Sequence, residues 1–218
     1  MMSPEPRPPG GRLHARDAAL APPEPVSLDG VRVRLEPLDL DRHFEGLCGV
    51  GLEPELWRWT TSVVRTRDDL RRYLETALRE RDSGHAAPFA TIDKPSGRIA
   101  GSTRFGNIDR HNRRVEIGWT WIGRAFRRTH VNTEAKYLML RHAFETLGCV
   151  RVELKTNVLN RRSRDAMLRL GCVEEGVLRK HAVSDDGVWR DTVYYSVLDT
   201  EWPAVKERLE TLLRRDES

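Results

Sequence analysis

The chain has 218 residues, enough for one domain with a sizeable core, and 39% are hydrophobic against 32% charged. The net charge of +4 comes from 37 basic and 33 acidic residues that interleave almost throughout, which argues against a surface dedicated to nucleic acid. No apolar run approaches the ~20 residues of a membrane span, and the start of the chain lacks the apolar core of a secretory signal. We therefore expect a cytoplasmic protein without a membrane partner.

Residues 1–26 are expected to form a disordered, proline-rich tail, and residues 27–218 a single domain. In that domain, Val31–Leu35 alternates as a first strand that ends at Pro37. A short helix is predicted over Leu40–Val50. A long helix should open at Thr66, an N-cap with Asp69 three residues later, and end near Gly84.

Three strands are predicted next, and they should begin the sheet in antiparallel fashion. Pro88–Asp93 and Arg98–Phe105 flank a proline-glycine turn, and a polar turn leads into Arg113–Ile122. In the third strand, Val115, Ile117, Trp119 and Trp121 are expected on one face. Gly118 in its interior suggests a bulge, or the close approach of another backbone or a ligand.

A strand-helix-strand unit is the central prediction. The helix should cover Val131–Leu147 and close at Gly148, and Cys149–Leu154 should form the next strand. The turn Gly123–His130 that precedes this helix is basic. A basic turn at a helix N-terminus is a favourable place for a phosphate group.

The rest of the chain predicts one more helix, a hairpin and a last helix. Asn160–Leu170 begins at a good N-cap and stops at Gly171. Cys172–Val183 and Val188–Leu198 surround an Asp-Asp-Gly turn, and Glu201–Arg215 is helical. Cys48, Cys149 and Cys172 have no paired spacing, so we expect neither a disulfide framework nor a metal site.

This order of elements resembles the GCN5-related N-acetyltransferase (GNAT) fold. Four phrases are similar to the branch of ribosomal-protein N-terminal acetyltransferases of the RimJ and RimL type. They are Glu116-Ile117-Gly118-Trp119, Asn132-Thr133-Glu134-Ala135-Lys136, Asn160-Arg161-Arg162-Ser163, and Leu170-Gly171 with Glu175-Gly176-Val177-Leu178-Arg179. The resemblance covers roughly residues 31–212. It implies an α/β (α+β) fold whose mixed, mostly antiparallel sheet has about six to seven strands flanked by helices.

The resemblance also implies acetyl-CoA as acetyl donor and a loop, Arg127–Asn132, whose backbone N–H groups face its pyrophosphate. Arg128, His130 and Asn132 stand where small residues are common in the family, which weakens this expectation because glycine admits the closest approach. The residues expected to contact the cofactor are Trp119, Trp121, Arg127, Arg128, Thr129, His130, Val131, Asn132, Thr133, Asn160 and Ser163.

For catalysis, the resemblance assigns Glu116 as the base that acts on the amine directly or through water, and Ser163 as a hydrogen-bond donor near the sulfur. Met167 stands where many members carry a tyrosine acid, and a thioether cannot donate a proton. Trp57, Trp59 and His181 are expected around the acceptor. The residues alone leave other interpretations open, since a strand glutamate is often a salt-bridge partner and a tryptophan is often core.

The predicted activity is direct acetyl transfer to a primary amine, either a protein N-terminus or a small molecule. No cysteine or serine lies in a recognisable nucleophile setting, which agrees with direct attack. The altered loop and the missing tyrosine motivate an alternative, a CoA-binding sensor or scaffold with little catalysis. A basic adaptor for RNA or the ribosome is a weaker alternative, and the resemblance makes a homodimer possible.

Overall fold

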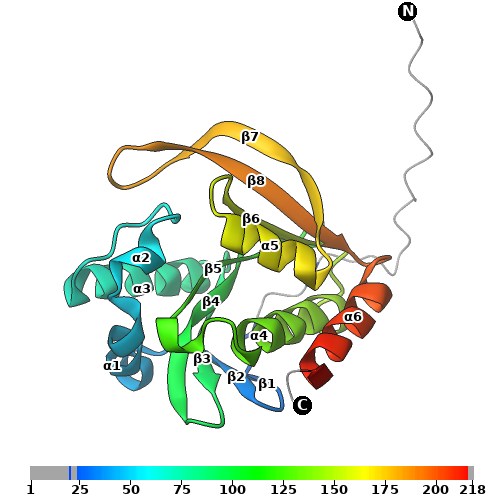
Figure 1. The fold of residues 1–218 in the computed structure, drawn as a ribbon, viewed down its shortest axis with the longest axis horizontal. Helices are drawn as coiled ribbons and strands as arrows, with labels where there is room; N and C mark the ends of the chain where they lie inside the picture. Colours follow the sequence, from blue (N-terminus) through cyan, green and yellow to red (C-terminus); the bar gives the residue numbers. More distant parts are fainter. Residues whose placement is uncertain (1–19, 21–23, 216–218) are drawn as a thin grey trace, which may run out of the picture.

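A computed structural model describes Leu20 and residues 24–215 (Figure 1). Most of the proline-rich tail expected over residues 1–26 therefore lies outside the described residues. Leu20 is buried, and its backbone N–H donates to the carbonyl of Arg110, whose Nε donates back to the Leu20 carbonyl. Val26 packs against the core. The domain boundary at residue 27 stays a prediction.

One sheet of eight strands organises the fold, in the order β1-β2-β3-β4-β5-β6-β8-β7. Every neighbouring pair is antiparallel except β5 and β6, which are parallel. This confirms the mixed, mostly antiparallel sheet, with one strand more than expected because β1 is too short to show a pattern. The strands are β1 (Leu28–Asp29), β2 (Val33–Pro37), β3 (Ala87–Asp93), β4 (Arg98–Asp109), β5 (Arg114–Ile122), β6 (Arg151–Asn157), β7 (Val173–Val183) and β8 (Trp189–Leu198).

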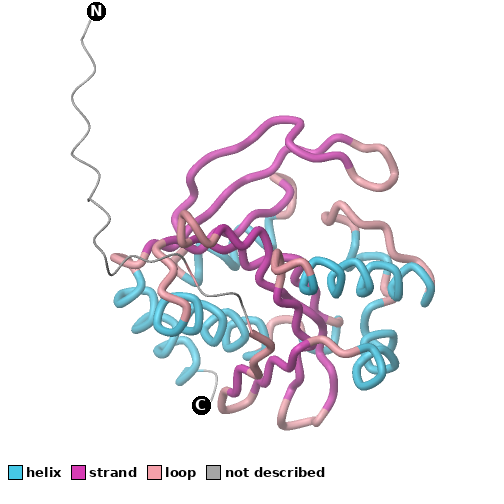
Figure 2. Tube along the Cα trace, turned by 180° about the vertical axis from the view of Figure 1, so that it is seen from behind, coloured by secondary structure: helices cyan, strands magenta, loops and turns pink. Residues whose placement is uncertain are grey.

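Helices cover both faces of the sheet (Figures 1 and 2). The helical segments are α1 (Leu40–Gly51), α2 (Pro54–Trp57), α3 (Arg67–Asp82), a 3₁₀ turn η1 (Arg124–Phe126), α4 (His130–Arg141), a π turn η2 (His142–Thr146), α5 (Arg161–Leu170) and α6 (Trp202–Arg215). Arg104 of β4 contacts Glu80 of α3, while the preceding Thr103 contacts Lys136 of α4. Since successive strand side chains alternate, α3 and α4 lie on opposite faces. None of the described helices is long and apolar enough to cross a bilayer.

The N-terminus of α3 is a capping box, as the sequence predicts. Thr66 Oγ1 accepts from the Asp69 backbone N–H at 3.1 Å, and Asp69 Oδ2 accepts from the Thr66 N–H at 2.9 Å. These two bonds satisfy amide groups that a helix end otherwise leaves without a partner.

Thr66→Ala is expected to lower the free energy of unfolding by about 1 kcal/mol, because it removes the cap acceptor. Urea unfolding followed by circular dichroism measures this loss. Thr76→Ala on the exposed side of the same helix is the matched control, since alanine is a better helix former there. Equal effects of the two substitutions would contradict the capping role.

A bulge in β5 corrects the predicted alternation of that strand. Arg104 pairs with Gly118 but Ser102 pairs with Trp121, so β5 contains one extra residue, and Trp119 has φ +49°. The bulge expected from the glycine is therefore present, with the left-handed backbone one residue later. The extra residue reverses the face on which the later side chains lie. Thr120 therefore shares the face of Ile117, and the rings of Trp119 and Trp121 lie on the opposite face.

The ends of three other elements also differ from the predicted ones. The strand expected from residue 31 begins at Val33, because Val31 lies in an exposed bend. The predicted helix Val131–Leu147 is α4 followed by the π turn, and Gly148 ends it with φ +73°. The strand predicted from Cys149 begins instead at Arg151, because the Cys149 N–H still bonds to the π turn.

Candidate active site

The parallel strands β5 and β6 separate within the domain. Their pairing covers only Arg114–Glu116 against Arg151–Glu153, although β5 continues to Ile122 and β6 to Asn157. We call the region beyond this last pair the fork. After the fork, β5 leads to α4 and β6 leads to α5, so two helix N-termini follow the carboxyl ends of two neighbouring parallel strands. Such an edge favours an anionic ligand.

The loop between β5 and α4 is basic and tightly held. Thr129 is the N-cap of α4: its Oγ1 accepts from the Val131 N–H at 3.3 Å and donates to the Phe126 carbonyl at 2.8 Å. Arg128 has φ +61°, a left-handed conformation in which glycine is most at ease. At Arg128 the loop therefore has the backbone conformation that a glycine would adopt most easily, although the residue is an arginine.

Arg127 carries a polar atom that the fold leaves unsatisfied. Its Nε donates to the Ile122 carbonyl at 3.2 Å, but its buried Nη2 has no hydrogen-bond partner. Burial and the nearby cation Arg162, at the start of α5, lower the pKa of Arg127. An anionic ligand at the N-terminus of α4 would give Arg127 Nη2 the partner that it lacks.

Other residues predicted in this loop serve the fold. His130 Nε2 lies 2.8 Å from Oδ1 of Asp93, the last residue of β3. Val131 is buried, and Thr133 is buried with Oγ1 accepting from Arg169 of α5 at 3.0 Å. The side chain of Asn132 is half-buried. The side chains of Val131 and Thr133 therefore serve the fold, and a ligand at this helix N-terminus would meet backbone N–H groups of the first turn.

Asn160 is the N-cap of α5, as predicted. Its Oδ1 accepts from the Ser163 N–H at 3.2 Å, and its Nδ2 donates to Thr156 Oγ1 at 3.1 Å. Ser163 is half-buried one turn into α5, whereas Met167 lies in the core. The cap therefore joins the end of β6 to the start of α5, beside the fork.

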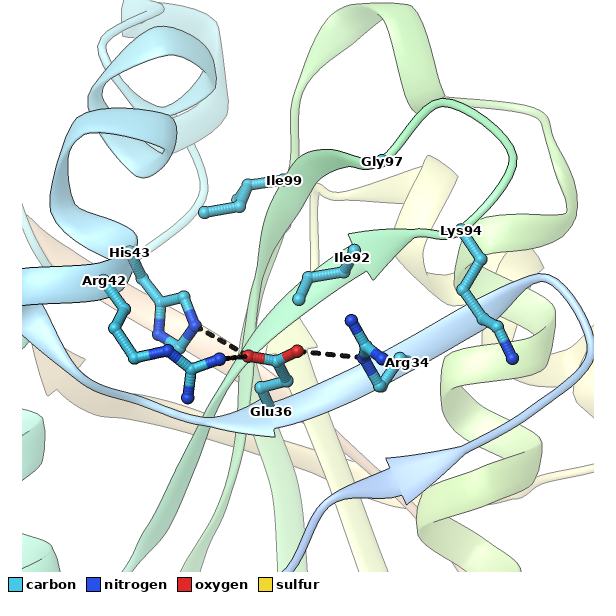
Figure 3. A pocket seen from close by; sticks show the side chains of 8 residues that line it. All are labelled: Arg34, Glu36, Arg42, His43, Ile92, Lys94, Gly97 and Ile99. Carbon is cyan, nitrogen blue, oxygen red and sulfur yellow. Dashed lines mark hydrogen bonds and ion pairs between the residues drawn. The ribbon is translucent and has the colours of Figure 1, made fainter.

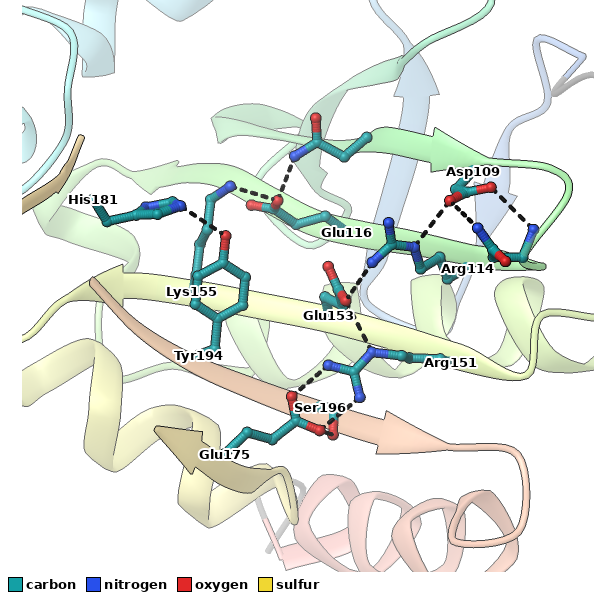
Figure 4. Close-up of polar contacts among 12 residues, drawn as sticks. Asp109, Arg114, Glu116, Arg151, Glu153, Lys155, Glu175, His181, Tyr194 and Ser196 are labelled. Atoms are coloured by element: carbon teal, nitrogen blue, oxygen red, sulfur yellow. Dashed lines mark hydrogen bonds and ion pairs between the residues drawn. The ribbon is translucent and has the colours of Figure 1, made fainter. Parts of the chain in front are cut away.

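Glu116 lies at the base of the fork and is 2% exposed, so its contacts are with protein groups (Figure 4). Lys155 Nζ of β6 lies 2.8 Å from Glu116 Oε2, and Asn107 Nδ2 donates to the same oxygen at 2.7 Å. Glu116 Oε1 faces Gly118, where an added Cβ would lie 2.8 Å from it. The strand glycine thus makes room for the carboxylate.

Lys155 extends the cluster toward β8. Burial alone would lower the pKa of Lys155, but Glu116, with a smaller contribution from Tyr194, raises it instead. Tyr194 lies opposite Lys155 in the β6–β8 register, and its Oη lies 3.3 Å from His181 Nε2. The structure therefore brings the predicted residues Glu116 and His181 into one cluster through two residues that were not predicted.

A hollow of ≈450 Å³ lies between α3, the β7–β8 turn and the bulge. Trp119 lines it and stacks on Arg104, whose guanidinium carbon lies 4.6 Å from the ring centroid. Arg104 is buried and bonds to Glu80 at 2.6 Å. The full lining is Ser62, Val63, Val64, Asp69, Arg72, Tyr73, Thr76, Glu80, Arg104, Trp119 and Asp185. The ring of Trp119 therefore faces this hollow rather than the loop Arg127–Asn132.

The remaining tryptophans differ in position. Trp57 and Trp121 are buried with ring centroids 5.5 Å apart, so their side chains belong to the core. Trp59 is half-buried, and its carbonyl accepts from Arg190 Nη1 at 3.2 Å. Asp185 also donates its N–H to the Thr61 carbonyl, so the β7–β8 hairpin reaches the loop after α2.

A second hollow, of ≈470 Å³, lies away from the fork between β2, α1 and the β3–β4 turn (Figure 3). Burial opposes ionisation of Glu36 there, but His43, Arg42 and Arg34 together lower its pKa. Lys94 is likewise engaged, by Asp29 and the Gly30 carbonyl. The charged groups that line this hollow thus pair with oppositely charged neighbours. We therefore see no reactive group among the described residues that line it.

Sequence reasoning missed Asn107, Lys155, Tyr194 and Arg104. Lys155 stands at an outward position of a strand, which is a common place for a solvated lysine. The one available signal was that only five lysines occur in the chain, beside many arginines. Which carboxylate meets this lysine depends on the register of β5 and β6, which no local pattern specifies.

Comparisons with known proteins agree with this geometry. The acetyltransferase (GNAT) domain family matches residues 32–173, and this chain belongs to that family. It is thus an acyltransferase by family.

A solved GCN5-related N-acetyltransferase from Brucella melitensis is 34% identical with a TM-score of 0.83, covering 90% of this chain and 89% of that one. The Bacillus subtilis protein named "Putative ribosomal N-acetyltransferase YdaF" is 36% identical over 110 residues, 50% of this chain and 59% of that protein's length. Mycobacterium smegmatis RimJ, solved in complex with CoA-disulfide, shares the fold at 22% identity and a TM-score of 0.75, covering 86% of this chain and 95% of that one.

Proposed function

We propose that this protein is an acetyl-CoA-dependent N-acetyltransferase that transfers acetyl directly to a primary amine. The acceptor is a protein N-terminus or a small molecule, and the names of the ribosomal relatives favour the former. The observation that carries the proposal is the fork, with a basic helix N-terminus on one side and the buried Glu116 cluster at its base. The cytoplasmic location stays a prediction.

The residues present fit acetyl-CoA. The unpartnered Nη2 of Arg127, the exposed Arg128 and the N-terminus of α4 would hold the pyrophosphate. Asn160 and Ser163 at the start of α5 would contact the pantetheine arm and the sulfur. When bound, acetyl-CoA supplies an activated thioester carbonyl to the fork. The chain's part is to position it beside the amine.

Glu116 is the proposed base. Both of its donors contact Oε2, so Oε1 is the oxygen that receives the ammonium proton of the acceptor, directly or through water. The amine that results attacks the carbonyl carbon, the bond to sulfur breaks, and the second nitrogen proton ends on the thiolate. Ser163 would stabilise the developing negative charge on sulfur by donating a hydrogen bond.

Changing Arg127 and Arg128 together to alanine is expected to weaken acetyl-CoA binding about 10- to 100-fold, the loss of one or two charge-assisted hydrogen bonds. Calorimetric titration of the full chain measures this. Arg214→Ala combined with Arg215→Ala in the last turn of α6 is the control of equal charge change and should bind as the wild type does. Failure of the wild type to bind acetyl-CoA would overturn the proposal. Tight binding without CoA release for any amine would favour the sensor or scaffold alternative.

A further inference from the structure

This inference deepens the proposed transfer and rests on it. An acceptor ammonium gives up one proton per turnover that remains on neither product, so the site must return that proton to solvent. Glu116 is 2% exposed, and its Oε2 is held by Lys155 and Asn107. A proton taken by this carboxylate therefore needs a route out of the protein.

A row of polar groups leads from Glu116 to His181 (Figure 4). Lys155 Nζ lies 2.8 Å from Glu116 Oε2 and 5.6 Å from the ring centroid of Tyr194, the residue opposite it in the β6–β8 register. Tyr194 Oη lies 3.3 Å from His181 Nε2, and the two rings are nearly perpendicular at 85°. His181 is exposed on β7. The row thus crosses β5, β6, β8 and β7 and ends in solvent.

The charges around His181 keep its ring ready to accept a proton. Partial burial, then Lys155 of β6 and Arg190 of β8, lower the pKa of His181, and Glu116 of β5 opposes them. The neutral ring predominates at pH 7, because the ordinary histidine pKa already lies near 6.5. An unprotonated Nε2 can accept the Tyr194 hydroxyl proton.

We propose that Lys155, Tyr194 and His181 form a relay that carries the acceptor's proton from Glu116 to solvent. The protonated Glu116 turns its Oε1 hydroxyl toward Lys155 and returns the proton, as Lys155 gives one of its own, directly or through a water molecule, to Tyr194 Oη. Tyr194 in turn passes its hydroxyl proton to His181 Nε2, and His181 releases a proton from Nδ1 to water. Each group ends in its starting charge, and one proton has left the site.

The test is a CoA-release assay with imidazole rescue. Spermidine, an amino-acid amide and a decapeptide with a free N-terminus are the probe amines, and the one that wild type turns over fastest is used throughout. His181→Ala is expected to lower kcat by about 10²-fold, and added imidazole to restore part of it, since the vacated site is open to solution. Tyr194→Phe should also lower kcat, but added imidazole should not restore it. The missing hydroxyl lies between Lys155 and His181, where imidazole from solution does not replace it.

His85→Ala, an exposed histidine that contacts Ser83, is the control and should match wild type. If His181→Ala is as active as His85→Ala, the relay is wrong and the proposed function stands. A slow His181→Ala that ignores imidazole assigns the histidine a structural role and also overturns the relay. Absence of CoA release by wild type with every amine would remove the proposed function and the relay together.

Discussion

Glu116→Gln should lower kcat for acetyl transfer by about 10²- to 10⁴-fold, the range that a positioned acid or base contributes, and leave acetyl-CoA affinity unchanged. Glutamine keeps the size of the side chain but cannot take the ammonium proton. Its amide oxygen would take the place of Glu116 Oε2 and accept from Lys155 and Asn107, so that the amide NH₂ faces Gly118. Steady-state CoA release measures kcat, and calorimetry measures the affinity.

The matched control is Glu153→Gln. Glu153 lies beside Glu116 in the β5–β6 register, so both side chains share a face, but it pairs with Arg151 and Arg114 rather than with Lys155. Turnover should survive this substitution. Equal turnover in both variants would remove Glu116 from the chemistry.

A stability effect has to be separated from the catalytic one. Glu116→Gln leaves the cation of Lys155 in a largely buried place without its carboxylate, and breaking a buried pair costs about 3–5 kcal/mol. The double variant Glu116→Gln with Lys155→Met removes both charges and should regain much of that stability. If its turnover returns as well, the defect of the single variant was in folding rather than in proton transfer.

Lys136→Met should stabilise the protein at pH 7 by several kcal/mol. Lys136 of α4 is 5% exposed, and its Nζ donates to Thr120 Oγ1 at 2.6 Å and Thr103 Oγ1 at 3.2 Å. Burial lowers its pKa from 10.5 to about 7. That difference of about 3.5 pKa units corresponds to roughly 5 kcal/mol between the charged and neutral forms. Methionine keeps the length of the side chain without the charge.

The direction in which the free energy of unfolding changes with pH follows from the number of protons bound in the folded and unfolded states. Between pH 7 and pH 9 the folded Lys136 loses its proton while the unfolded lysine keeps it, so the unfolded state binds more protons. The free energy of unfolding of wild type therefore rises with pH, by about 2–3 kcal/mol over this window, and the variant lacks this contribution.

Urea unfolding at several pH values gives the free energy of unfolding of wild type and of Lys136→Met. The contributions of the other titrating groups are the same in both proteins and cancel in the difference. The two Thr hydroxyls lie 2.7 Å apart and stay paired with each other. Exposed Lys180→Met is the control and should run parallel to wild type. A gap between wild type and Lys136→Met that stays constant from pH 7 to pH 9 would show that Lys136 keeps its charge in the fold.

Local pattern predicted much of the fold. The caps at Thr66 and Asn160 and the stop at Gly148 depend on residues a few positions apart, and all three are present. The strand-helix-strand unit around α4 was predicted because hydrophobic period and terminal residues agree over a long segment. The GNAT family followed from the same order of elements together with four short phrases.

The positions of the predicted site residues depended more on the tertiary structure. Trp119 was expected with the cofactor, but one extra residue in β5 places its ring over Arg104. Trp57 and Trp121 were expected at the site, and their side chains lie in the core. A bulge changes the face of every later side chain, and its position depends on the register with β4.

The sequence by itself therefore determined the order, caps and approximate ends of the elements, because these depend on neighbours along the chain. Only the tertiary structure decided that Glu116 meets Lys155 and Asn107, that Tyr194 meets His181, and that Lys136 is buried without a carboxylate. Such pairs join residues from different strands and helices. Their contacts are set by register and packing, which a strand's own alternation leaves open.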